Sequence, residues 1–372
     1  MKRISTIIAL AIMPALFVQT GSAETVVEGI VGGGYQGNLF NDSNLTSDQY
    51  ASLGLDIKHY PSGSVQLKGS GRYNKFSEYS DLSNFTGEVS GMYIPTSDSS
   101  PLTLALSGSI ATQSFGQLYQ LYDQTSARGG LDLDLAMTQR VHLQLSGSYD
   151  NNDYRNSDYG SNRNLDLSSG ISTTIGGANS VALRFDFSRR SFDQPAINGS
   201  PGNLTLVSGK EKTETFDATG LLGRFSRPLG QRTGINLSAG VRILHFDNNL
   251  TVLGYTIDYL SPWADLWEGG SFSARLKHYF PSQLILELSG AYFDKQFVDV
   301  VELSDSSNET YWQDGREDKL TTAGLSLARP ISLKSGGMLT PSLYVGYRNN
   351  SSTADYFSYD NFSASLSLKI RF

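Results

Sequence analysis

Residues 362–372 read FSASLSLKIRF and alternate between apolar and polar side chains at every position. Successive side chains of a β-strand point to opposite faces, so this segment predicts a strand with one apolar face and one polar face. The apolar set is Phe362, Ala364, Leu366, Leu368, Ile370 and Phe372, and the polar set is Ser363, Ser365, Ser367, Lys369 and Arg371.

The same alternation recurs along the chain in segments of about ten residues that polar turns separate. We count about sixteen segments, an even number that suits a bacterial barrel, although residues 213–229 have an ambiguous parity and residues 316–331 a weak one. Short turns, such as residues 61–63, alternate with longer links, such as residues 194–212. The sequence therefore predicts an all-β fold, a transmembrane antiparallel up-and-down β-barrel with its short turns in the periplasm. The segments are expected to start near residues 26, 48, 64, 84, 101, 124, 140, 163, 180, 213, 233, 264, 283, 316, 337 and 358.

Composition excludes other classes of protein. A mean hydropathy of −0.26 excludes a helical membrane protein, and a net charge of −7 argues against nucleic-acid binding. The absence of cysteine suits a chain that crosses an oxidising periplasm. A short basic start, a mostly apolar run and small residues before Glu24 predict a signal peptide over residues 1–23, cut near Ala23. Residues 24–372 would then form a single barrel domain.

A soluble β-sandwich also alternates, and the placement of aromatic residues argues against one. Tyr35 follows Val27 by eight positions on the same face, and this spacing recurs on other segments. Eight residues cover about 26 Å of strand, or about 20 Å along the membrane normal after strand tilt, close to the apolar band of such barrels. Tyrosine suits the membrane interface because its ring is apolar and its hydroxyl is polar. The predicted membrane-interface aromatics are Tyr35, Tyr73, Tyr93, Tyr149, Tyr292 and Tyr347.

The last hairpin, residues 339–372, carries the run YRNNSS from Tyr347 and closes on Phe372. It resembles the final hairpin of porin-like β-barrels of the Gram-negative outer membrane. It also resembles the barrel domains of tetratricopeptide-linked exporters of polysaccharides and surface lipoproteins. The resemblance implies that Phe372 is the assembly signal read by the barrel-assembly machinery. The exporters carry helical repeats of about 34 residues, and we find no such period here.

The polar parity of the strands is expected to face a water-filled lumen, because about sixteen strands enclose more space than side chains fill. Its charges leave two interpretations open. Opposed walls of opposite charge would select solutes by charge and dipole, whereas locally paired charges would keep the lumen wet. The predicted pore-lining residues are Lys68, Arg72, Asp132, Asp134, Arg184, Asp186, Arg242, Arg275, Lys277, Glu287, Arg348, Lys369 and Arg371.

Three functions remain open. The leading hypothesis is an outer-membrane channel for small polar or charged solutes. The alternatives are an export barrel for an exopolysaccharide or another secreted polymer, and a structural or surface-binding barrel with a blocked lumen. Residues 194–212 are the longest candidate for a loop that folds inward as a constriction.

An enzyme is not expected, and no catalytic residue, metal or cofactor is predicted. The sequence has no metal-ligand cluster, phosphate loop or nucleophile elbow, and His142 lacks an acid at the spacing of a catalytic triad. The expected location is the outer membrane of a Gram-negative cell. The expected partners are outer-membrane lipids and lipopolysaccharide, the barrel-assembly machinery and periplasmic chaperones. A second copy of the chain or a periplasmic export partner is left open.

Overall fold

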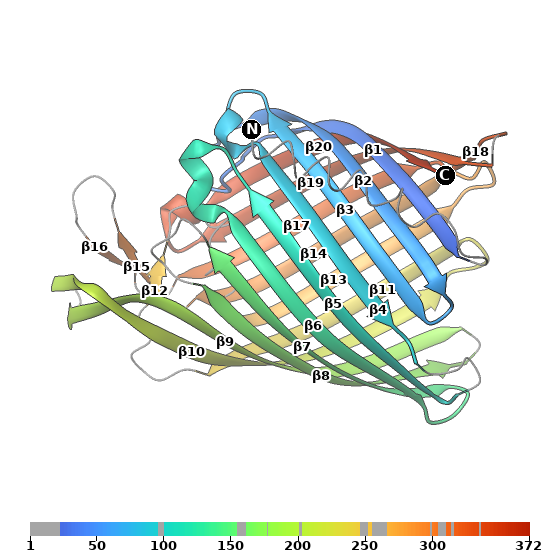
Figure 1. The fold of residues 1–372 in the computed structure, drawn as a ribbon, viewed down its shortest axis with the longest axis horizontal. Coiled ribbons are helices and arrows are strands. Elements are labelled where there is room, and N and C mark those ends of the chain that lie inside the picture. Colours follow the sequence, from blue (N-terminus) through green and yellow to red (C-terminus); the bar gives the residue numbers. More distant parts are fainter. Residues whose placement is uncertain are drawn as a thin grey trace.

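The computed structural model describes residues 23–372 apart from 96–99, 155–160, 177, 201–202, 246–251, 255–265, 298–299, 304–309, 314–315 and 335. Sixteen strands close into one antiparallel barrel (Figure 1). Closure comes from β1 (Glu24–Gln36), which pairs with both β2 (Asp48–Ser62) and β20 (Tyr359–Arg371). The other barrel strands are β3 (Val65–Phe76), β4 (Asn84–Tyr93), β5 (Leu102–Ser114), β6 (Gln124–Ala136), β7 (Val141–Tyr154), β8 (Asn162–Ile175), β9 (Asn179–Ser200), β10 (Asn203–Pro228), β11 (Thr233–His245), β13 (Trp267–Tyr279), β14 (Ile285–Phe297), β17 (Glu317–Ala328) and β19 (Met338–Ser352).

The predicted up-and-down order is confirmed, because each barrel strand pairs antiparallel with the next barrel strand along the chain. The alternation of apolar and polar residues also predicted where most strands begin. For example, β2, β4 and β6 begin at the predicted residues. The exception is β10, which was expected near residue 213 and begins at Asn203. Its parity is ambiguous because inward positions such as Phe216 and Leu222 are apolar, so no polar face marks the strand.

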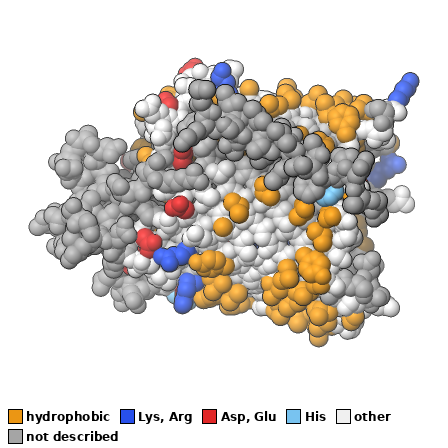
Figure 2. Space-filling model, in the orientation of Figure 1, with side chains coloured by type: hydrophobic (Ala, Val, Ile, Leu, Met, Phe, Trp, Pro, Cys, Tyr) orange, Lys and Arg blue, Asp and Glu red, His pale blue; other side chains and the backbone are white. Residues whose placement is uncertain are grey.

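Cross-strand registers sort the residues onto two faces of the closed sheet. Leu53 lies opposite Val31 and Tyr73, whereas its neighbour Gly54 lies opposite Arg72. The apolar set forms the outer surface, where Figure 2 shows apolar side chains along the barrel wall and charged side chains near its ends. The polar set surrounds the lumen. Within the described residues, no helix is both long and apolar enough to cross a membrane.

The two ends of the barrel differ. Short turns and the C-terminus lie at one end, named here the turn end, together with β18 (Ile331–Ser332), which pairs with β19 (Figure 1). Longer connections lie at the opposite end, named the loop end. They contain the short helices η2 (Ser80–Leu82), η3 (Gln117–Tyr122) and η5 (Asp355–Phe357). A separate sheet of β12 (Val252–Gly254), β15 (Val300–Leu303) and β16 (Thr310–Gln313) forms within two of these links.

Apolar packing inside the protein is concentrated at the loop end, because the barrel walls face lipid or lumen. The ring of Phe40 lies 5.8 Å from that of Tyr79, and the ring of Tyr119 lies 6.4 Å from that of Tyr122. Burial raises the pKa of the Tyr119 hydroxyl, and the neighbouring Tyr79 and Asp81 add to the effect. The connections that contain η2 and η3 therefore pack against each other.

Candidate functional site

The structure places every predicted pore-lining residue on the inner face of the barrel. Lys68 and Arg72 lie on β3, and Asp132 and Asp134 lie on β6, each opposite other inner-face residues. The remaining positions follow the same registers on the later strands. They are Arg184 and Asp186 on β9, Arg242 on β11, Arg275 and Lys277 on β13, Glu287 on β14, Arg348 on β19, and Lys369 and Arg371 on β20.

The predicted interface tyrosines lie on the outer face with their side chains exposed, and Phe372 lies at the barrel seam. The Phe372 N–H donates to the Val27 carbonyl at 2.9 Å, and the Val27 N–H donates to the Phe372 carbonyl at 3.1 Å. The last residue therefore closes the hydrogen-bonded seam between β20 and β1. The tyrosines concerned are Tyr35, Tyr73, Tyr93, Tyr149, Tyr292 and Tyr347.

Charges on the inner face pair mainly with close neighbours. Each of the five pairs joins two residues on the same strand or on neighbouring strands. This geometry supports the interpretation of local pairing over that of opposed walls. Most of these side chains stay partly exposed, as expected for ion pairs beside water. The inner-face pairs are Lys68 with Glu88 (3.9 Å), Arg128 with Asp150 (3.3 Å), Arg184 with Asp186 (2.9 Å), Arg275 with Glu287 (3.2 Å) and Lys369 with Glu28 (3.2 Å).

A recess of about 620 Å³ opens on the inner face between β5 and β13. It exists because small side chains occupy many inward positions there, and the hydroxyls of Ser146 and Ser168 lie 2.7 Å apart on its wall. Its size falls in the range of sites for small organic molecules. One row of cross-strand neighbours crosses it in the order Asp132, Ser146, Ser168, Asp186, Gly220 and Arg242.

Aromatic rings and cations meet where the recess approaches the loop end. The guanidinium of Arg242 lies 5.3 Å from the centre of the Trp267 ring, and the ammonium of Lys295 lies 5.1 Å from it. A ring holds a cation over its face by electrostatic attraction. The sequence pattern marked Arg242 as lumenal and missed its contact with Trp267, which depends on the pairing of β11 with β13.

His142 has an acidic partner that sequence reasoning missed. Its Nδ1 lies 2.9 Å from Asp134 Oδ1, and Gln144 Nε2 donates to Asp134 Oδ2 at 2.9 Å. The short turn between β6 and β7 brings these positions together, so hairpin register was the signal that could have revealed the contact. The described residues contain no group of three or more side chains that could hold a metal ion.

Buried polar side chains hold the connections in place at the loop end, and none of them was predicted from the sequence. Asp48 accepts the backbone N–H groups of Glu78 at 3.0 Å and Tyr79 at 2.9 Å. Asn361 Nδ2 donates to the Asn38 carbonyl at 2.7 Å, and its Oδ1 accepts the Asn38 N–H at 3.2 Å. Inward positions at the ends of β2 and β20 thus hold the connections that follow β3 and β1.

Replacing Asp48 with alanine is expected to loosen residues 77–83. The change removes the acceptor for the backbone N–H groups of Glu78 and Tyr79 in this segment, and for that of Gln49, at a cost of about 1–3 kcal/mol for each donor left unsatisfied. Chymotrypsin added to the folded protein should then cut faster after Tyr79, which lies in this segment. The control is Ser52→Ala on the same face of β2, which should leave the cleavage rate unchanged. Equal rates for the Asp48 variant and the unchanged protein would contradict this role.

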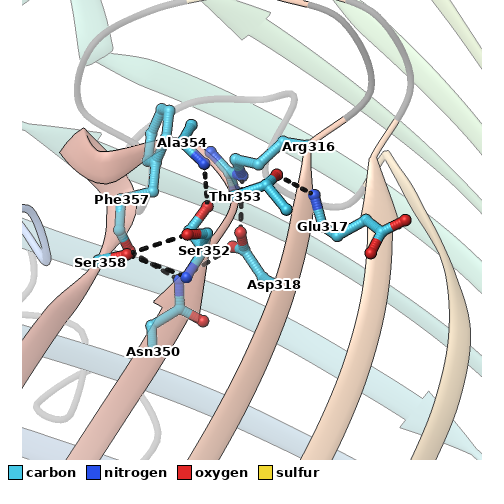
Figure 3. A network of polar contacts seen from close by, with 9 residues as sticks. All are labelled: Arg316, Glu317, Asp318, Asn350, Ser352, Thr353, Ala354, Phe357 and Ser358. Atoms are coloured by element: carbon cyan, nitrogen blue, oxygen red, sulfur yellow. Dashed lines mark hydrogen bonds and ion pairs between the residues drawn. The ribbon is translucent and has the colours of Figure 1, made fainter.

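A second anchor surrounds Arg316 (Figure 3). Its Nε lies 3.1 Å from Asp318 Oδ1, and its guanidinium lies between the rings of Phe297 and Phe357, 3.9 and 3.7 Å from their centres. Asn350 Nδ2 donates to Asp318 Oδ2 at 3.0 Å and to the Phe357 carbonyl at 2.7 Å. This cluster joins β17, β19 and η5 beneath the connections of the loop end.

The prediction that residues 194–212 fold inward as a constriction is wrong. Most of this segment belongs to β9 and β10, which pair from Gln194 with Lys212 out to Ser200 with Asn203. The hairpin projects past the barrel (Figure 1). Backbone pairing between two long strands outweighed the turn-forming residues. On the inner face below the hairpin, a buried apolar cluster comprises Phe192, Phe216, Ala218, Leu244 and Leu266.

Comparison with known proteins gives similarity to solved structures alone, since no family model and no curated protein matches the chain. OccK3 (OpdO) from Pseudomonas aeruginosa is 11% identical with a TM-score of 0.46, covering 95% of this chain and 96% of that one. OccAB1 from Acinetobacter baumannii is 10% identical with a TM-score of 0.47, covering 95% and 97%. The siderophore receptor PirA from Pseudomonas aeruginosa is 9% identical with a TM-score of 0.43, covering 94% and 81%. Identities and TM-scores this low support no conclusion about function, so the proposed function rests on the lumen of the barrel.

Proposed function

We propose that this protein is an outer-membrane channel that passes small polar or charged solutes through the lumen of its barrel. The observation that carries the proposal is the inner face. Its serine, glycine and charged positions surround the interior of a sixteen-stranded barrel. A barrel of this size encloses an aqueous passage, and a polar lining lets solutes keep their hydration or exchange it for side-chain contacts.

The outer face supports a membrane location. Large apolar side chains remain exposed along it, including Leu53, Ile110 and Leu366, an arrangement that costs little in lipid and much in water. We place the protein in the outer membrane, with the interface tyrosines at the headgroups and Phe372 as the assembly signal. Lipids, lipopolysaccharide, the barrel-assembly machinery and periplasmic chaperones are the partners this placement requires.

The signal peptide belongs to the same proposal. Residues 1–22 lie outside the described residues, and β1 begins at Glu24, next to the expected cut. Export to the outer membrane requires such a segment and its removal. The N-terminal residue of protein purified from the outer-membrane fraction tests this point. Glu24 or a close neighbour is expected, and retention of Met1 would contradict it.

Liposome swelling tests the channel function. Vesicles that contain the purified protein should swell in isotonic solutions of small sugars and amino acids, at rates that fall as solute size increases. The control vesicles contain the same amount of heat-unfolded protein. Swelling no faster than in the control would contradict passive diffusion, leaving polymer export or a blocked barrel as the function to pursue.

A further inference from the structure

The recess between β5 and β13 contains two carboxylates that lack a cation. Asp132 on β6 and Asp166 on β8 line it on either side of β7, whose Ser146 and Ser148 lie between them. Among the residues that the structure describes, neither carboxylate makes an ion pair or a side-chain hydrogen bond. By contrast, Asp134, which lies on the same strand as Asp132, has a partner, and so does Asp186, on the strand next to that of Asp166. A carboxylate without a partner beside water leaves a place for a cationic group.

The basic side chains of the same recess are all arginines. Arg184 meets Asp186 through its Nε, and its side chain stays 50% exposed. Arg128 meets Asp150 through its Nε at 3.3 Å and donates from Nη2 to Ser148. A guanidinium has five N–H donors in a planar fork, so these contacts leave donors for the two oxygens of a carboxylate or phosphate. The arginines of the recess are Arg128, Arg184, Arg190 and Arg242.

We propose that this recess is a binding site for small zwitterionic solutes, which carry an ammonium group together with a carboxylate or phosphate. The ammonium group binds at Asp132 and Asp166, and the anionic group binds at Arg184 or Arg128. A purely anionic solute would meet the two free carboxylates, and a purely cationic solute would meet the guanidinium groups. A solute with both charges has a favourable partner for each. The inference rests on the proposed channel function, because the recess is reached through the lumen.

Three probes with the same length of carbon chain separate these cases. They are 4-aminobutyrate as the zwitterion, butyrate as the anion and butylammonium as the cation. The measurement is the concentration of each probe that interrupts half of the single-channel current in a planar bilayer. We expect 4-aminobutyrate to interrupt the current at the lowest concentration. Calorimetric titration of the detergent-solubilised protein with the same probes measures binding when no current is available.

Variants test separately the carboxylates that bind the ammonium group and the arginines that bind the anionic group. Asp132→Asn combined with Asp166→Asn should raise the half-blocking concentration of 4-aminobutyrate and butylammonium by about tenfold, since charged hydrogen bonds are lost. It should leave the value for butyrate unchanged or lower. Arg184→Gln should show the opposite preference, weakening butyrate and strengthening butylammonium. The matched control is Asp56→Asn, an inner-face carboxylate on β2 outside this recess, which should change none of the three values.

The outcomes distinguish failure of the proposed binding site from failure of the proposed channel function. An open channel that no probe interrupts would overturn the zwitterion site and leave the channel function standing. Equal effects of the paired aspartate variant and the Asp56 variant would also overturn it, because the effect would then come from overall charge. A protein without current or vesicle swelling would contradict the channel function, and the calorimetric titration would then confirm or overturn the binding site independently.

Discussion

Replacing Arg316 with alanine is expected to cost about 3–5 kcal/mol of stability, because it leaves the charge of Asp318 buried without its partner. The side chains of this pair are 8% and 5% exposed. The guanidinium also fills the space between Phe297 and Phe357, so the variant loses packing as well as charge. Urea unfolding in lipid vesicles, followed by tryptophan fluorescence, measures the change.

Arg275→Ala provides the matched control for this prediction. It breaks an inner-face pair with Glu287 whose side chains are 64% and 31% exposed. Such a pair contributes about 0–1 kcal/mol, so the control should unfold close to the unchanged protein. Arg316→Met with Asp318→Leu removes both buried charges and should recover much of the loss. If the Arg316 and Arg275 variants lost equal stability, the buried anchor would have no special role.

Gly269→Ala is expected to cost about 3 kcal/mol or more, because backbone strain and a steric clash add at one position. Gly269 on β13 has a φ of +136°, and a Cβ there would clash with the Asp294 carbonyl oxygen of β14. The two strands could accept the methyl group only by moving apart near Trp267. Urea unfolding measures the loss of stability, and gel mobility of the unheated protein reports how much folds.

Substitution of the adjacent glycine distinguishes the steric clash at Gly269 from a general effect of replacing a glycine in β13. At Gly270, which points to the outer face, a Cβ would meet no atom within 4 Å. Gly270→Ala should therefore fold and unfold like the unchanged protein. A similar loss in both variants would show that backbone flexibility, and not the close approach to Asp294, explains the result.

The barrel could be predicted from the sequence because one physical rule repeats along it. A wall with lipid outside and water inside requires alternation on every strand, and residues 362–372 show it without a break. The rule weakens where the environment changes. Inward Phe216 on β10 is apolar because it belongs to a buried apolar cluster at the loop end, and on this strand the start was missed.

The contacts of the candidate site were less predictable, because they depend on register and on connections without a period. Parity alone placed Asp134 and Arg275 on the inner face. The pairing of neighbouring strands then decided that Asp134 lies beside His142 and Arg275 beside Glu287. Asp48 and Asn361 are polar residues at strand ends, where exposed and buried positions look alike in sequence. Their partners come from residues far along the chain or in other connections.

Single-channel conductance of the purified protein in a planar bilayer tests the central claim most directly. We expect a steady conductance on the nanosiemens scale, because a polar sixteen-stranded lumen admits hydrated ions. The reversal potential in a salt gradient should show weak ion selectivity, since charges of opposite sign lie side by side at several places on the inner face. A barrel that stays closed, or opens only in rare bursts, would contradict the channel function.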